Sequence, residues 1–137
     1  MPFQYQTRIR YGECDQQGVV FNANYMVYMD DASEQWISSL AGDGDFRSLG
    51  WDWMLVRCVL EWQAPAHFGE VLTIAVGIVR YGSTSFDIGY VGTVGDRPVF
   101  TARAICVSVE PVTLKKWAIP AQIREKLGTV VEMEVPV

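Results

Sequence analysis

The stretch from Tyr11 to Leu40, YGECDQQGVVFNANYMVYMDDASEQWISSL, joins a polar loop to the only long helix that the sequence predicts. Apolar residues three or four positions apart indicate this helix: Tyr25, Met29, Ala32, Trp36 and Leu40. Such spacing places them on one helical face, and acidic and serine residues fill most of the other positions. We expect a helix from about residue 24 to about residue 41, with Asn22 or Asn24 as its cap and Gly42 after its end.

Segments of alternating or continuous apolar residues lie on both sides of this helix and predict five strands. One precedes the loop at 3–9, and four follow the helix at 56–62, 71–81, 86–90 and 99–110. Short turns rich in Gly, Pro and Asp separate the last four, which makes neighbouring strands antiparallel. A short helix is expected after Pro120 and through Leu127.

The predicted elements favour one architecture. An antiparallel sheet has to bury its apolar face, and the long helix is the only element that can cover it. We therefore predict an α+β fold in which a five-stranded antiparallel sheet wraps around one central helix, as a single domain over residues 1–137. The strand at 71–81 is apolar on both faces, so we expect a partner subunit of a homo-oligomer to cover its second face.

Charge and composition exclude several classes of function. The net charge of −5 and the isoelectric point of about 4.7 argue against general affinity for nucleic acid, which requires a basic surface. No secretion signal or membrane-spanning run is visible, so no membrane partner is expected. Cys14, Cys58 and Cys106 form no metal or redox motif, which favours reduced thiols in a cytoplasmic protein.

Carboxylates remain the best candidates for chemistry, because the chain lacks a serine-hydrolase elbow, a phosphate loop and a dinucleotide motif. The only histidine, His67, lies in a turn and is expected to be non-catalytic. Asp15 precedes the long helix, whose first N–H groups are unpaired and partly positive. Together they offer a nucleophile or base and an oxyanion site for acyl transfer. An aspartate before a helix is also a common turn residue, so that alternative stays open.

The loop and helix start resemble the 4-hydroxybenzoyl-CoA thioesterase family of hot-dog proteins. The matching residues are an aromatic residue, two acidic residues, a glycine, an apolar pair and the Asn-Tyr that opens the helix: Tyr11, Glu13, Asp15, Gly18, Val19, Val20, Asn24 and Tyr25. The segments APAHFGEVLTI at 64–74, YGSTSF at 81–86 and IPAQIREKL at 119–127 extend the resemblance over most of the chain.

The resemblance implies a hot-dog fold, assembly into homodimers or homotetramers, and hydrolysis of an acyl-CoA thioester to an acid and free CoA at a subunit interface. It implies that Asp15 is the catalytic carboxylate, as nucleophile or general base, and that the backbone N–H of Asn22 holds the thioester carbonyl. Gly18, Val20 and Tyr25 are the other expected substrate-binding residues. No metal and no further cofactor is implied.

Other functions of the same fold remain as alternatives. A non-catalytic acyl-CoA-binding or sensing module would bind the thioester without cutting it, and a structural homo-oligomer would do neither. A hot-dog dehydratase would need a histidine with an acidic partner, and His67 lies in the wrong segment for it. Asp15 beside a helix start favours the hydrolase over these alternatives.

Overall fold

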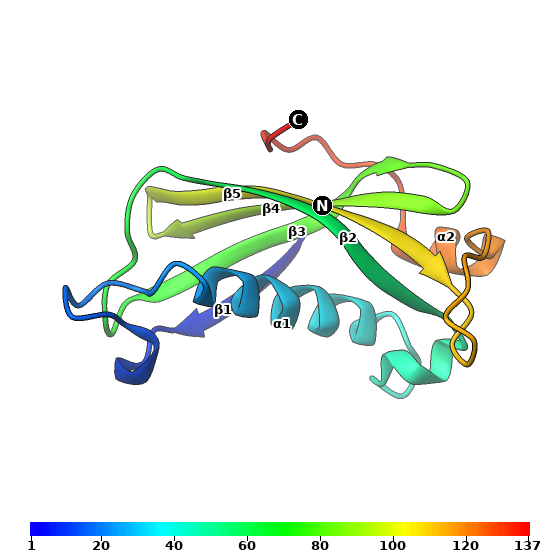
Figure 1. The fold of residues 1–137 in the computed structure, drawn as a ribbon, viewed down its shortest axis with the longest axis horizontal. Coiled ribbons are helices and arrows are strands. Elements are labelled where there is room, and N and C mark those ends of the chain that lie inside the picture. Colours follow the sequence, from blue (N-terminus) through cyan, green and yellow to red (C-terminus); the bar gives the residue numbers. More distant parts are fainter.

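A computed structural model describes the whole chain, from Met1 to Val137, and its long helix lies along one face of a five-stranded antiparallel sheet (Figure 1). The strands are β1 (Phe3–Arg8), β2 (Asp52–Trp62), β3 (Val71–Tyr81), β4 (Ser85–Val94) and β5 (Arg97–Val109). The helices are α1 (Asn24–Ser39) and α2 (Ala121–Leu127), with short 3₁₀ turns at Tyr11–Glu13 and Phe46–Leu49. The predicted architecture is therefore confirmed.

The strand order is β1-β3-β4-β5-β2, so the first two strands of the sequence form the two edges of the sheet. The helix buries the stripe that its spacing predicts, because Tyr25, Met29, Ala32 and Trp36 are all at most 6% exposed. Neither helix of the structure has the length and apolar character needed to cross a bilayer.

Two boundaries differ from the predicted ones. The helix ends at Ser39, with Leu40 as its C-terminal cap, slightly before the expected end. Strand β2 starts at Asp52, before the strand expected at 56–62. Trp51 explains the earlier start, since its indole N–H donates to Ser108 Oγ at 2.7 Å and its ring stacks on Trp53 with centroids 5.4 Å apart.

The chain itself covers the part of the second face of β3 around Gly77, whereas Val71 on the same face is 47% exposed, so the expected partner subunit stays a prediction. Residues 129–137 run over the sheet on the side opposite α1 (Figure 1). Val131 N–H donates to Ile78 O at 2.8 Å, and the Arg103 guanidinium donates to Pro136 O at 2.6 Å. Pairing of Gly77 with Gly89 leaves space for this tail, because neither residue carries a side chain.

Gly92 lies in close contact with the ring of Phe100 inside the core. A β-carbon on Gly92 would overlap the buried ring of Phe100. We expect Gly92→Ala to lower the free energy of unfolding by about 1–3 kcal/mol, the usual cost of overpacking, as measured by urea denaturation. Gly42→Ala is the matched control, because Gly42 has no atom near the position of a β-carbon. Equal stability of the two variants would contradict the close packing described here.

Candidate active site

The loop before α1 is a tight hairpin. Cys14 pairs with Val20, the Asp15 N–H donates to Val19 O at 2.8 Å, and the Gly18 N–H donates to Asp15 O at 3.0 Å. Gly18 has a φ of 77°, in the left-handed region that glycine adopts without strain. Gln16 and Gln17 therefore form a turn, and Gly18 follows it in the left-handed conformation, which is a common hairpin connection. Gly18 shapes this loop through its backbone and does not line the cleft described below.

The Asp15 side chain takes part in the same turn. Its Oδ1 accepts a hydrogen bond from the Gln17 N–H at 2.8 Å, while Oδ2 has no partner, and the side chain is half-buried. Asp15 faces Val19 across the hairpin, so the two side chains project from one face. Val19 lines a cleft and Asp15 does not. The structure thus places the carboxylate at the rim of the cleft, with one oxygen free.

The start of α1 offers unpaired backbone donors. Ala23 occupies the cap position without a side-chain hydrogen bond, and neither Asn22 nor Asn24 caps the helix as expected. The Asn24 side chain instead donates to the backbone carbonyl of Glu13 at 2.8 Å and ties the loop to the helix. The backbone N–H groups of Asn22 and Ala23 have no acceptor in the chain. They are available to a carbonyl oxygen.

A cleft of about 320 Å³ lies beside these donors. The hairpin and helix start form one side of it, and the end of β2 with the following turn forms the other: Val19, Val20, Asn22, Tyr25, Trp62, Gln63, Ala64 and Pro65. Three of the predicted substrate-binding residues, Val20, Asn22 and Tyr25, are therefore brought together.

Tyr25 forms a rigid wall of the cleft. Only 1% of the residue is exposed, and its hydroxyl accepts the Ala66 N–H at 3.2 Å. The ring packs edge-on against Phe100 and Trp62, with centroids 5.3 and 6.0 Å away. Burial raises the pKa of this phenol, so it stays neutral and serves the fold rather than proton transfer.

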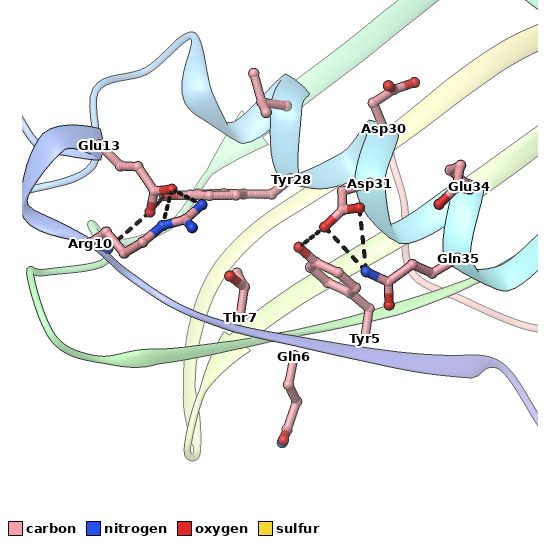
Figure 2. Close-up of a pocket in the computed structure, with 11 residues that line it drawn as sticks. Tyr5, Gln6, Thr7, Arg10, Glu13, Tyr28, Asp30, Asp31, Glu34 and Gln35 are labelled. Carbon is pink, nitrogen blue, oxygen red and sulfur yellow. Dashed lines mark hydrogen bonds and ion pairs between the residues drawn. The ribbon is translucent and has the colours of Figure 1, made fainter.

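Glu13 anchors the other end of the loop (Figure 2). Its carboxylate accepts the Arg10 N–H at 2.9 Å, the Arg10 guanidinium at 2.7 Å and the Tyr28 hydroxyl at 2.9 Å. Burial alone would raise the pKa of Glu13, but these hydrogen bonds outweigh it and the pKa is lowered. Sequence analysis missed Arg10, Tyr28 and the role of Asn24. Only the three-residue spacing of Arg10 and Glu13 hinted at a local pair.

His67 lies on the opposite side of the hairpin. Its backbone pairs with Val19, and its Nδ1 is 3.2 Å from a carboxylate oxygen of Glu70. The Arg97 guanidinium also contacts Glu70, at 2.5 Å, and its hydrogen bond, with those of His67, lowers the pKa of Glu70 to about 2 against the opposing effect of burial. The His67 side chain thus contacts Glu70. The His67 backbone pairs with Val19 on the side of Val19 opposite to Asp15.

Groups for a metal or for the phosphates of a ligand are also defined. No cluster of three or more His, Cys, Asp or Glu side chains is arranged to hold a metal ion. Arg80 and Arg103 flank the buried Asp87 carboxylate at 2.9 and 2.6 Å. They belong to the face of the sheet under the C-terminal tail, whereas Arg57 is exposed on β2.

Structural comparison identifies the fold as the hot-dog fold of thioesterases. A hypothetical protein from Aquifex aeolicus has a TM-score of 0.83 at 24% identity, over 92% of this chain and 99% of its own. An aspartate-to-asparagine mutant of 4-hydroxybenzoyl-CoA thioesterase, complexed with 4-hydroxybenzoyl-CoA, has a TM-score of 0.82 at 25% identity, over 92% and 98%.

Sequence comparison gives the family. The model of the thioesterase-like superfamily matches residues 9–127, so the chain belongs to this family. It is 27% identical to a 1,4-dihydroxy-2-naphthoyl-CoA hydrolase of Synechococcus elongatus, over 91% of this chain and 94% of the relative. It is 28% identical to a putative acyl-CoA thioesterase of Bacillus subtilis, over 81% and 86%. The predicted family and enzyme class, a thioester hydrolase, are confirmed.

The ion pair beside the cleft should make stability depend on pH. Glu70 has a pKa of about 2 in the fold, below its ordinary value of 4.5, so the folded state favours its ionised form. Its contribution is complete above about pH 4.5 and is lost as the pH falls toward 2. We expect Glu70→Gln to flatten this part of the curve of unfolding free energy against pH, measured by thermal unfolding. An unchanged acid limb would show that Glu70 is not stabilised by Arg97.

Proposed function

We propose that this enzyme hydrolyses acyl-CoA thioesters, with Asp15 as its catalytic carboxylate. The observation that carries the proposal is the pair of free N–H groups at Asn22 and Ala23. They lie beside the cleft, and the hairpin that directly precedes them carries the free Asp15 oxygen. A carbonyl oxygen bound by these N–H groups would bring its carbon toward the rim where the carboxylate lies. The acyl-CoA substrate is supported by the relatives, which are named as hydrolases or thioesterases of such esters.

The reaction needs few groups. Water or the Asp15 carboxylate adds to the thioester carbon, and the electrons of the carbonyl move to its oxygen, which the N–H groups stabilise. The C–S bond then breaks, the thiolate takes a proton, and acid and CoA leave. If Asp15 adds directly, water hydrolyses the acyl anhydride in a second step. If Asp15 is a base, it removes a proton from the attacking water.

The hydrogen bond from Gln17 suits either role of Asp15. It orients the carboxylate through Oδ1 and leaves Oδ2 to act. No cation pairs with Asp15, so its negative charge is not neutralised by a neighbour. A related thioesterase with one aspartate replaced by asparagine was captured with its substrate, which agrees with a carboxylate that acts in turnover rather than in binding.

Replacement of Asp15 tests the mechanism. We expect Asp15→Asn to lower kcat about 100-fold or more, the range for loss of an acid–base group, while acyl-CoA still binds. The amide preserves the oxygen that accepts the Gln17 N–H, so the melting temperature should change little. CoA release from a panel of acyl-CoAs is followed with a thiol-trapping dye.

Asp96→Asn is the matched control, because Asp96 is exposed in the turn between β4 and β5 and does not line the cleft. Full activity of Asp15→Asn would refute the catalytic role of Asp15. One observation favours the alternative function, a non-catalytic acyl-CoA-sensing module: Asp15 does not line the cleft. Tight acyl-CoA binding without CoA release by the unmodified protein would support it against hydrolysis.

We also propose a homodimer, with a homotetramer as its possible further assembly, built on the free edge of β2. This strand pairs only with β5 and leaves its other edge open. Met54, Leu55 and Val56 are 45%, 48% and 58% exposed there, a continuous apolar run on an unpaired edge. Pairing with a second copy would bury this run and bring two clefts to one interface.

A charge on this edge tests the assembly. We expect Val56→Lys to shift the protein from dimer to monomer, because the ammonium group would be buried against the partner strand. Sedimentation velocity measures the shift. Val112→Lys is the control, since Val112 is 88% exposed in the turn after β5 and is not part of the β2 edge. A Val56→Lys protein that stays dimeric would place the interface elsewhere.

A further inference from the structure

Sulfur atoms gather at one place between α1 and the sheet. A cavity of about 180 Å³ lies there, and two methionines of the helix and two cysteines of the sheet line it: Met26, Met29, Cys58 and Cys106. The whole chain has three cysteines and five methionines, so two of its three thiols meet at this cavity. The third cysteine, Cys14, lies in the hairpin and does not line it.

Strand pairing places the two thiols as diagonal neighbours. Cys58 on β2 is paired with Ala104 on β5, and Cys106 follows Ala104 by two positions on the same face. Diagonal neighbours of this kind have Cα atoms about 7–8 Å apart. That separation is longer than the Cα distance of about 4.4–6.8 Å that a disulfide requires. The two thiols are therefore free, and they are placed to share one ligand rather than to bond to each other.

The cavity is open to cations from solvent. Its lining residues Met26 and Leu55 are 38% and 48% exposed, whereas Cys106 is only 2% exposed. Asp30 also lines the cavity, and it is an exposed acid in a chain whose net charge is −5. A negative field raises the local concentration of positive ions. Entry of a cation is therefore favoured and entry of an anion is opposed.

Burial limits which cations can stay. A thiol in an apolar site keeps its proton, and a charge buried there has to be balanced by a neighbouring charge. An ion that binds sulfur strongly displaces the proton of a thiol. When a monovalent ion binds, one thiol releases its proton to solvent, and the thiolate balances the charge of the ion. The second thiol and a thioether then donate lone pairs without adding any charge.

We propose that this cavity binds one soft monovalent metal ion, of the copper(I) class, between the thiols of Cys58 and Cys106, with the Met29 thioether as a third donor. Thiolate and thioether sulfur select copper(I) over hard ions such as Mg²⁺. The donors come from α1, β2 and β5, so no short spacing motif in the sequence reveals them. This inference goes beyond the proposed hydrolysis and does not depend on it.

The stoichiometry of binding tests the shared site. Silver(I) is the probe, because it has the charge and the sulfur preference of copper(I) and is stable in air. Titration calorimetry uses the reduced Cys14→Ser protein, in which Cys58 and Cys106 are the only thiols. We expect one tightly bound Ag⁺ per chain. Two ions per chain would show that each thiol binds alone, and either that result or no binding would overturn the proposal.

The choice of metal provides a second test on the same protein. Zn²⁺ takes its ligands from Cys, His, Asp and Glu, and no group of three such side chains is arranged around an ion position. We therefore expect Zn²⁺ and Mg²⁺ to bind far more weakly than Ag⁺. Affinity for Zn²⁺ equal to that for Ag⁺ would refute a site that selects soft monovalent ions.

Substitutions in the Cys14→Ser protein assign the donors. Cys58→Ala and Cys106→Ala should each weaken the Kd for Ag⁺ by about 100-fold or more, and Met29→Leu, which nearly preserves volume, by about tenfold. Met133→Leu is the matched control, because Met133 lies in the C-terminal tail and does not line the cavity, and it should keep the parent Kd. Parent affinity in both alanine variants would place the ion elsewhere. Parent affinity in Met29→Leu would remove the thioether from the site.

Competition with glutathione distinguishes a shared site from a single thiol. Excess reduced glutathione should remove Ag⁺ from the Cys58→Ala and Cys106→Ala variants and leave it on the Cys14→Ser parent, as measured by native mass spectrometry. Equal loss from the parent and the variants would refute the shared site. Release of CoA is not measured in these experiments, so their outcome is independent of whether the protein hydrolyses acyl-CoA.

Discussion

The whole site depends on one set of backbone hydrogen bonds, which fastens the hairpin at 14–20 between the helix start and the turn after β2. Val20 N–H donates to Ala66 O at 2.9 Å, and Phe68 N–H donates to Gly18 O at 3.1 Å. Phe21 N–H donates to Glu13 O at 3.0 Å on the other side. These bonds use the loop's own donors and acceptors, so the loop is held without burying unpaired groups. The N–H groups of Asn22 and Ala23, beside the cleft, are among the donors left without an acceptor.

The two carboxylates of this short segment differ in their hydrogen-bond partners. Glu13 and Asp15 are two residues apart, yet one carboxylate is saturated by Arg10 and Tyr28 while the other has a free oxygen. A saturated carboxylate with a lowered pKa holds structure, and an unpaired one at a cleft rim is available for reaction. The fold therefore gives the two acids different sets of donors, and only Asp15 keeps an oxygen free for the role that we propose.

Much of the fold could be predicted because periodicity reports burial directly: the stripe from Tyr25 to Trp36 is buried as its spacing requires. Val20, Asn22 and Tyr25, which the resemblance of the loop implied as substrate-binding residues, line one cleft in the structure, whereas the role of Asp15 stays a prediction. Contacts between distant residues were not predictable in the same way. The Asn24 side chain reaches back eleven positions to Glu13, and no periodicity encodes which carbonyl an amide meets. The early start of β2 similarly depends on a bond between Trp51 and Ser108.

The tail over the sheet has one more consequence. Gly77 and Gly89 face each other across β3 and β4, and Val131, Met133 and Val135 lie above them. These three side chains, distant in sequence from the strands, thus fill the space that the two glycines leave on the sheet. The part of the outer surface around these two glycines is therefore already covered by the chain itself, while Val71 at the start of β3 stays 47% exposed. The homodimer that we propose would thus have to use strand edges or the parts of the sheet that the tail leaves open.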